Sequence, residues 1–392
     1  MKSPAPAHAR ISIIGAGPGG LTCARVLRQH GIAATVYDRD PDAASRDQGG
    51  SLDLHEEDGQ LALREAGLIE EFFALARLES QEERRLDTGG RLLGHRLPGE
   101  GETARPEIDR GQLRDLLLRS LDAGTVRWGR ALKSVSGPDD GPRTLTFTDG
   151  STVETDLVVG ADGAFSRVRA AVSDAVPRYT GVGFLEAWFD TVESAHPELA
   201  ELVGRGSAHV ADGERGLFAQ RNSGGHMRVY LMRRVPLDWM AASGLRPEDT
   251  EGIRARLLAE YAGWSPSLLR LLTENDGAYV DRPLFALPVP HAWRHTPGVT
   301  LLGDAAHLMP PLGVGVNLAM LDAAELALAL ARSATVDDAV RTYEKTMLPR
   351  SAEIAGMLEG GAGFLLEEPD AEDLARDPLA AERAGGREGA GG

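Results

Sequence analysis

Three glycines near the amino terminus have the spacing of a phosphate-binding loop. Gly15, Gly17 and Gly20 match G-x-G-x-x-G and follow the apolar run Ile11 to Ile14. The first glycine of such a loop permits a tight turn, the second lets a pyrophosphate approach the backbone, and the third allows close helix–strand packing. The helix that begins here would direct its N–H groups and positive dipole end at the phosphates. The loop therefore predicts a bound dinucleotide.

An acidic residue completes this fingerprint. Asp38 ends the next apolar segment, 34–37, about 20 residues beyond the loop, where a carboxylate can bind both hydroxyls of an adenosine ribose. A glycine-rich turn near a surface acid is the alternative. Strand, helix, strand and acid all in register favour nucleotide binding.

Two later segments each place an acidic residue after an apolar run. Asp162-Gly163 follows one such run and Gly303-Asp304 follows another. Both would lie at the carboxyl edge of a sheet, where α/β folds bind ligands. Two arginines beyond the first segment could meet phosphates or could be solvated surface groups: Arg167 and Arg169.

A turn rich in proline and glycine follows Asp304. Pro310, Pro311, Gly313 and Gly315 precede a long Ala/Leu-rich helical segment. The turn would present backbone amides at a helix start, and these would stabilise negative charge on a reduced ring system. A helix cap plus an ordinary loop is the alternative.

The pattern of apolar residues predicts an α/β fold with an inserted second domain. Segments 11–37 read as strand, helix and strand, whereas 181–234 alternates as in an antiparallel sheet. The chain is therefore expected to form a discontinuous Rossmann-like domain, an antiparallel-sheet substrate domain and a long C-terminal helix. The predicted parts are a first nucleotide-binding segment at 8–175, the sheet domain at 176–280, a second nucleotide-binding segment at 281–333, a bridging helix at 334–366 and a disordered tail at 367–392.

Composition excludes several classes of partner. The 392 residues carry a net charge of −17, which argues against nucleic acid and anionic membranes. No signal-like segment or apolar run of about 20 residues is visible, so we expect a cytoplasmic protein, and a monomer. The single cysteine, Cys23, is expected to pack in a helix. The histidines lack metal-ligand spacing, so no metal is expected.

Three motifs in this order resemble the class A flavoprotein monooxygenases, the family of p-hydroxybenzoate hydroxylase. They are GAGPGG (15–20), GADGAFSRVR (160–169) and GDAAHLMPP…GVN (303–317). The resemblance runs from about 11 to 358 and implies FAD as the cofactor. The residues that it assigns to FAD are Gly15, Gly17, Gly20, Asp38, Arg39, Asp53, Arg110, Asp162, Asp304, Gly315 and Asn317.

Further motifs look like the tetracycline-inactivating subgroup. They are GGSLDLHEEDGQLALREAGL (49–68) and RPEIDRGQLRDLLLRSL (105–121). This likeness implies that Asp53 lies at the flavin and that Arg46 contacts NADPH. Independently of the family, Arg46 and Arg110 could be surface charges. His307 in GDAAH is expected to be structural rather than a general base.

Two departures bear on the substrate. The turn PPLGVGVN, which includes Pro311, is a residue shorter than its equivalent in the tetracycline-modifying enzymes. Glu186 and Arg228 stand where those enzymes use Gln and His. Such a pair could grip a polyketide with different hydrogen-bond polarity, or could face water.

The expected function is an FAD-dependent monooxygenase that uses NADPH, or NADH, and O₂ to hydroxylate an aromatic or polyketide small molecule, with tetracyclines as one candidate. In such chemistry the flavin carries the reactive groups, so no catalytic side chain is assigned. A flavin dehydrogenase or oxidase and a non-catalytic ligand-sequestering flavoprotein are the alternatives.

Overall fold

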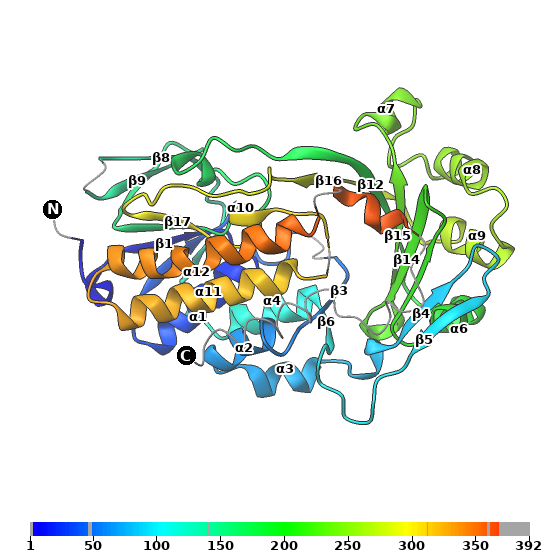
Figure 1. Ribbon diagram of the computed structural model, residues 1–392, viewed down its shortest axis with the longest axis horizontal. Coiled ribbons are helices and arrows are strands. Elements are labelled where there is room, and N and C mark those ends of the chain that lie inside the picture. The colour runs from blue at the N-terminus through cyan, green and yellow to red at the C-terminus, as the bar shows by residue number, and fades with distance from the viewer. Residues whose placement is uncertain (1–2, 46–48, 139–140, 312, 359–360, 368–392) are drawn as a thin grey trace. The chain divides into compact units, whose positions relative to one another are not determined.

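The computed structural model describes residues 3–45, 49–138, 141–311, 313–358 and 361–367 (Figure 1). The chain divides into two compact units. Unit 1 comprises Met1–Ala76, Thr103–Arg178 and Phe285–Glu359, and unit 2 comprises Arg77–Glu102, Tyr179–Leu284 and Gly360–Gly392. None of the helices in the described part of the chain has both the length and the apolar content needed to cross a membrane.

Unit 1 is built on a parallel sheet in the strand order β17-β11-β1-β2-β7. Its strands are β1 (Ile11–Ile14), β2 (Ala34–Tyr37), β7 (Val126–Arg127), β11 (Leu157–Gly160) and β17 (Val299–Leu301). Ile14 pairs with Tyr37 and Gly160, and Gly160 pairs with Leu301. The carboxyl ends of four strands therefore meet in one row. The loops that follow them start from the same edge of the sheet.

Helices α1, α11 and α12 run side by side against this sheet (Figure 1). A Cβ on Gly19 of α1 would lie 3.0 Å from the carbonyl oxygen of Ala319 on α11, so a glycine permits this close packing. The helices of the unit are α1 (Pro18–Gln29), α2 (Gly59–Glu65), α3 (Ile69–Leu75), α4 (Arg110–Arg119), α10 (Asp304–His307), α11 (Gly315–Arg332) and α12 (Val336–Gly356), with 3-10 turns η1 (Pro6–His8) and η3 (Arg169–Ala171).

Two smaller antiparallel sheets complete unit 1. One has the order β10-β9-β8 and the other pairs β3 with β6. Their strands are β8 (Leu132–Ser136), β9 (Arg143–Phe147), β10 (Thr152–Thr155), β3 (Ser51–Asp53) and β6 (Glu107–Asp109). Residues Ser51–Asp53 form the strand that pairs with Glu107–Asp109.

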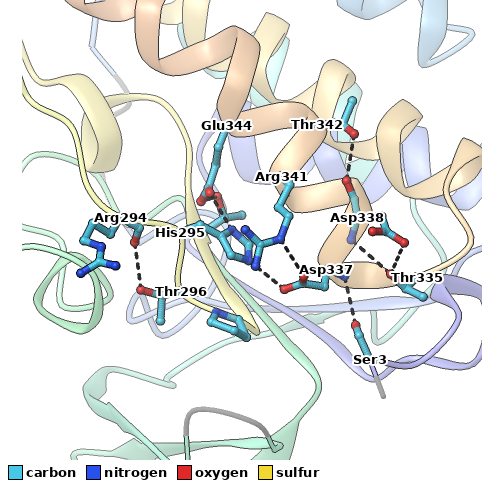
Figure 2. Close-up of polar contacts among 12 residues, drawn as sticks. Ser3, Arg294, His295, Thr296, Thr335, Asp337, Asp338, Arg341, Thr342 and Glu344 are labelled. Atoms are coloured by element: carbon cyan, nitrogen blue, oxygen red, sulfur yellow. Dashed lines mark hydrogen bonds and ion pairs between the residues drawn. The ribbon is translucent and has the colours of Figure 1, made fainter. Parts of the chain in front are cut away.

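A buried polar cluster fixes the segment before β17 to α12 (Figure 2). Glu344 accepts hydrogen bonds from Trp293 Nε1 and Thr300 Oγ1, each at 3.0 Å, and lies 2.8 Å from His295 Nδ1. The other ring nitrogen of His295 lies 2.7 Å from Asp337 Oδ1. This buried carboxylate is fully partnered, as a stable buried charge requires. The cluster lies at the amino-terminal end of β17, away from the loops that carry the predicted cofactor residues.

Unit 2 is a seven-stranded sheet in the order β16-β12-β15-β14-β13-β4-β5. Its strands are β4 (Glu83–Leu86), β5 (Leu92–Arg96), β12 (Arg178–Phe189), β13 (Ser207–Ala211), β14 (Arg215–Arg221), β15 (Met227–Arg234) and β16 (Val280–Ala286). Leu185, Val229 and Leu217 point to one face and pack against helices. Those helices and turns are α5 (Val192–Ala195), α6 (Pro197–Val203), α7 (Trp239–Ala242), α8 (Thr250–Glu260), α9 (Pro266–Thr273), η2 (Glu79–Gln81) and η4 (Ser223–Gly225).

The α/β architecture with a discontinuous nucleotide-binding part agrees with the sequence prediction, but the division of the chain differs from the predicted bounds. The predicted first segment, 8–175, includes Arg77–Glu102, which the structure places in unit 2. The cause is long-range pairing, because β4 lies parallel to β13. The 3-10 turn η5 (Gly361–Leu366) also belongs to unit 2. The predicted tail lies outside the described residues except for Glu367.

Candidate functional site

The glycine loop after β1 fits a pyrophosphate. Gly15 has φ +110°, and a Cβ there would lie 2.2 Å from the carbonyl oxygen of Ala161; a Cβ on Gly20 would lie 2.0 Å from that of Gly15. Both positions therefore exclude a side chain. A Cβ on Gly17 would meet nothing within 4 Å. Gly17 is also the N-cap of the twelve-residue helix α1, so the loop is open beside the first-turn N–H groups of that helix.

Asp38 is buried beside this loop. Its Oδ2 accepts a hydrogen bond from the backbone N–H of Ala16 at 2.6 Å and its Oδ1 accepts one from that of Asp40 at 2.8 Å. A carboxylate has about four acceptor sites, so two remain for ribose hydroxyls. Arg39, next in sequence, is exposed.

Arg114 is a functional candidate that sequence reasoning missed. Its side chain is 2% exposed, Nε donates to the carbonyl of Ala16 at 3.1 Å, and Nη1 donates to that of Ala43 at 2.6 Å. Its guanidinium also lies over the ring of Trp128, 5.2 Å from the centroid. Arg114 thus ties the glycine loop to the segment around Ala43. The available sequence signal is its i, i+3 spacing to the apolar Leu117, which is also buried.

The Asp162 carboxylate caps its own loop. It accepts hydrogen bonds from Ser166 Oγ at 2.6 Å and from the backbone N–H of Arg167 at 2.7 Å. Burial raises the pKa of Asp162 against the lowering effect of these donors. A Cβ on Gly163 would meet nothing within 4 Å, so the backbone after Asp162 is open to a ligand.

Arg169 joins two of the predicted loops. It is buried, its Nε donates to the carbonyl of Ala305 at 2.8 Å, and its Nη2 donates to the carbonyls of Ala164 and Asp304 at 2.9 Å. The loop after β11 is thus tied to the loop after β17. Because its donors serve backbone carbonyls, Arg169 acts in the structure as a brace and not as the phosphate contact considered from the sequence; Arg167 is exposed.

A buried ionic network involves Gly303 and His307, on either side of Asp304 in the sequence. The carboxylate of Asp304 itself is exposed and accepts no hydrogen bond from any described residue. Asp322 Oδ2 accepts from the N–H of Gly303 at 3.0 Å and lies 2.6 Å from His307 Nε2. Its Oδ1 accepts from Arg350 at 2.8 Å. Burial would raise the pKa of Asp322, but His307 and Arg350 hold it below its ordinary value. His307 takes part in this network through Nε2.

Asn317 connects the start of α11 to β3. Its Nδ2 donates to the carbonyl of Asp53 at 2.9 Å, and its Oδ1 accepts from the N–H of His55 at 2.9 Å. The Asp53 carboxylate lies 2.9 Å from His55 Nε2, and Asp58 lies 3.7 Å from Nδ1. Burial lowers the pKa of His55, but the two carboxylates have a larger effect in the opposite direction and raise it to about 9. The Asn317 side chain is therefore used within the protein.

The remaining predicted residues lie at loop or helix starts. Arg110 is exposed at the first position of α4 and its N–H donates to the carbonyl of Gly50 at 3.0 Å. Gly315 begins α11, with nothing within 4 Å of a would-be Cβ. Pro311 is exposed in the turn before it. Arg46, the predicted NADPH contact, lies outside the described residues.

In unit 2, Glu186 and Arg228 form an ion pair. Glu186 Oε1 accepts from Arg228 Nη1 at 2.9 Å, and Arg282 donates to the other oxygen of the same carboxylate. The idea that both residues simply face water is therefore wrong, because the Glu186 side chain is 1% exposed. Sequence reasoning missed Arg282, which is brought there by the pairing of β16 with β12.

Comparisons with known proteins define the family. The family model described as an FAD binding domain matches residues 8–356. Monooxygenase asqM of Emericella nidulans is 34% identical over 82% of this chain and 84% of its own length, and monooxygenase penA of Penicillium thymicola is 34% identical over 87% and 92%. The 3-amino-4-hydroxybenzoate 2-monooxygenase of Streptomyces cremeus is 32% identical over 88% and 84%.

Solved structures show the same fold. HpxO of Klebsiella pneumoniae, in complex with FAD and uric acid, superimposes with a TM-score of 0.76 at 21% identity, over 98% of this chain and 93% of that one. The tetracycline destructase Tet(55) superimposes with a TM-score of 0.68 at 22% identity, over 98% and 95%.

These findings establish the class of protein. The chain belongs to the FAD-binding-domain family of class A-like flavin monooxygenases. It is an FAD-dependent monooxygenase, as its motifs predict.

Proposed function

We propose that this enzyme uses NADPH and O₂ to hydroxylate an aromatic or polyketide small molecule that binds on one face of the sheet in unit 2. The observation that carries the proposal is a set of flat and charged side chains on the face opposite the helices. We call it the polar-aromatic face, and its residues are Phe184, Glu186, Trp188, Phe218, Gln220, Arg228 and Tyr230. Phe218 and Tyr230 are stacked at 28° with centroids 6.3 Å apart.

The names of related proteins support this class of substrate. One relative is a 3-amino-4-hydroxybenzoate monooxygenase, and tetracycline destructases share the fold. Both names describe oxygen-rich cyclic substrates, which suit stacking on aromatic rings with polar groups at the edge. Tetracyclines therefore belong among the first compounds to test.

The residues predicted from the sequence would hold FAD in unit 1. The glycine loop would bind its pyrophosphate, Asp38 its ribose, and Asp53, Arg110, Asp304, the backbone of Asn317 and the turn with Pro311 and Gly315 its remaining parts. The flavin, reduced by NADPH, would supply the oxygen-activating chemistry. The protein would orient the substrate, exclude water and direct backbone dipoles at developing negative charge. Arg46 remains the proposed contact for NADPH.

The test is cofactor oxidation by the purified FAD-loaded enzyme. Consumption of NADPH and NADH is measured with and without tetracyclines and simple phenols, and the product is analysed after reaction under ¹⁸O₂. We expect ligand-stimulated NADPH oxidation and one labelled oxygen in the product. Oxidation without label in the product would instead identify a dehydrogenase or oxidase.

We further propose a cytoplasmic monomer. NADPH is supplied inside the cell, and one copy of the chain contains all of the proposed FAD-binding loops. Sedimentation velocity of the FAD-loaded protein checks the oligomeric state. A dimer at micromolar concentration would contradict it.

A further inference from the structure

Three strands of unit 2 place one carboxylate between two guanidinium groups. Glu186 on β12 accepts from Arg228 on β15 at 2.9 Å and from Arg282 on β16. Glu186 is 1% exposed, whereas the Arg282 side chain is 50% exposed. Both carboxylate oxygens are therefore occupied, and Glu186 is not available to bind a cationic ligand.

Two guanidinium groups, those of Arg228 and Arg282, share the Glu186 carboxylate. Among the described residues, Arg282 donates only to Glu186, and it does so through Nε. Its terminal N–H groups donate to no described residue, and half of the side chain is exposed. A planar guanidinium of this kind favours oxyanions with two acceptor atoms.

Flat side chains adjoin the cluster on the same face. Tyr230 is directly opposite Glu186 in the sheet register, and Phe218 is directly opposite Tyr230. Trp188 packs against Arg228, whose guanidinium lies 5.6 Å from the ring centroid. Adjacent strands are about 4.8 Å apart, so Tyr230 lies two strands, about 10 Å, from Arg282 and within the span of one fused-ring molecule.

The chain itself covers another part of this face. Leu366 of η5 packs with Val182 and Met232, and a Cβ on Gly216 would lie 3.3 Å from the carbonyl oxygen of Leu365. The row containing Phe184 and Met232 is therefore covered by protein, and Phe218 in the next row packs against the same cluster. The rows containing Glu186 and Trp188 carry the charges and most of the rings.

We propose that Arg282, oriented by Glu186 and assisted by Arg228, binds an oxyanion at the edge of a planar substrate. This inference rests on the proposed function, in which the substrate occupies the polar-aromatic face. The oxyanion is either an aromatic carboxylate or the ionised enol of a 1,3-dicarbonyl group, since both present two coplanar oxygen atoms to a guanidinium. Arg282 would thus determine specificity for acidic over neutral substrates.

Paired probes separate these two sources of the oxyanion. The FAD-loaded enzyme is titrated calorimetrically with 4-hydroxybenzoate against 4-hydroxybenzamide, and with 3-acetyl-4-hydroxycoumarin, whose acetyl and enolate oxygens lie on the same side, against 3-acetyl-4-methoxycoumarin. Each pair keeps the ring and removes the charge. We expect at least one acidic member to bind about 10- to 100-fold more tightly than its neutral partner, as the loss of a charge-assisted hydrogen bond implies.

Three variants assign that preference to Arg282. Arg282→Gln should weaken the preferred acid about 10- to 100-fold and leave its neutral partner unchanged, while Arg282→Lys should restore part of the loss. The control is Arg246, an exposed arginine between α7 and α8. Arg246→Gln removes the same charge from unit 2 and should change the binding of neither probe.

The result that overturns the inference is equal binding of acidic and neutral probes by the wild type, or an equal loss for both in Arg282→Gln. Failure of the proposed function looks different. If acids bind through Arg282 without stimulating NADPH oxidation, the oxyanion site stands and hydroxylation of those compounds does not. If neutral phenols are hydroxylated with no preference for acids, hydroxylation stands and the oxyanion site does not.

Discussion

The carboxyl edge of the parallel sheet in unit 1 and the polar-aromatic face in unit 2 are constructed in different ways. At the edge, the proposed ligand-facing positions are glycines and backbone amides, as at Gly15, Gly17 and Gly163, and long side chains hold the loops in place. On the face, the proposed ligand-facing positions are themselves long side chains such as Arg228 and Arg282. A backbone-built site suits an invariant group such as a pyrophosphate, whereas a side-chain-built site can change its specificity by substitution.

The largest loss of folding stability is expected when the buried network around Asp322 is broken. Asp322→Ala removes the carboxylate shared by Gly303, His307 and Arg350. The buried His307 ring loses its ionic partner, whereas Arg350 keeps its ion pair with Glu325. Breaking a buried ion pair in this way costs about 3–5 kcal/mol. Chemical denaturation followed by circular dichroism measures the loss.

If Asp322→Ala unfolds like the wild type, the edge does not depend on this network. Asp338→Ala is the matched control, since it removes a carboxylate from an exposed position on α12 and should cost far less.

The glycines of the loop provide the next test. Gly20→Ala would place a Cβ 2.0 Å from the carbonyl oxygen of Gly15, so strain of about 1–3 kcal/mol and loss of bound FAD are expected together. Gly17→Ala meets no protein atom within 4 Å and should lower FAD affinity without lowering the stability of the apoprotein. Flavin absorbance after gel filtration and apoprotein melting temperatures distinguish the two. Equal effects on both properties in both variants would show that the loop is only a turn.

Two single-carboxylate substitutions compare the regions directly. Asp304→Ala removes an exposed carboxylate at the edge and should weaken FAD binding about tenfold, with normal folding. Glu186→Gln removes the buried carboxylate of the polar-aromatic face. It should leave FAD content unchanged but weaken the binding of the acidic ligand. Wild-type flavin content in Asp304→Ala, or lost flavin in Glu186→Gln, would remove the distinction between the regions.

The same contrast explains what the sequence could predict. The glycine loop, Asp38 and the two strand-end acids follow from local spacing, because each depends on one turn next to one strand. The bracing residues Arg114, Arg169 and Asp322 depend on contacts between loops that are far apart in the chain. For Arg114 and Asp322 the sequence signal was a charged residue on an otherwise apolar helix face, which is weak by itself. Arg169 was named from the sequence, but as a possible phosphate contact and not as a brace.

The strand pairing in the sheet of unit 2 was even harder to predict from the sequence. Glu186 and Arg228 were named as candidates, but Arg282 joins them only because β16 pairs with β12. Likewise β4 and β5 enter this sheet through the parallel pairing of β4 with β13, which no local pattern in 77–102 indicates. Non-local strand pairing is set by packing over the whole face, so a single segment does not reveal it.

The smallest effect concerns the junction of β3 with α11 and depends on pH. Burial lowers the pKa of His55 and nearby Arg105 also lowers it, but Asp53 and Asp58 outweigh both and raise the pKa to about 9, above its ordinary value near 6.5. The folded protein therefore binds the proton more tightly than the unfolded chain. This stabilisation is complete below about pH 6.5 and is lost as the pH rises through about 9. The melting temperature of the wild type should thus fall between pH 7 and pH 10 by a few degrees more than that of His55→Gln, which cannot become charged. If the melting temperatures of the two proteins fall equally between pH 7 and pH 10, the Asp53–His55–Asp58 cluster contributes nothing to holding β3 beside α11.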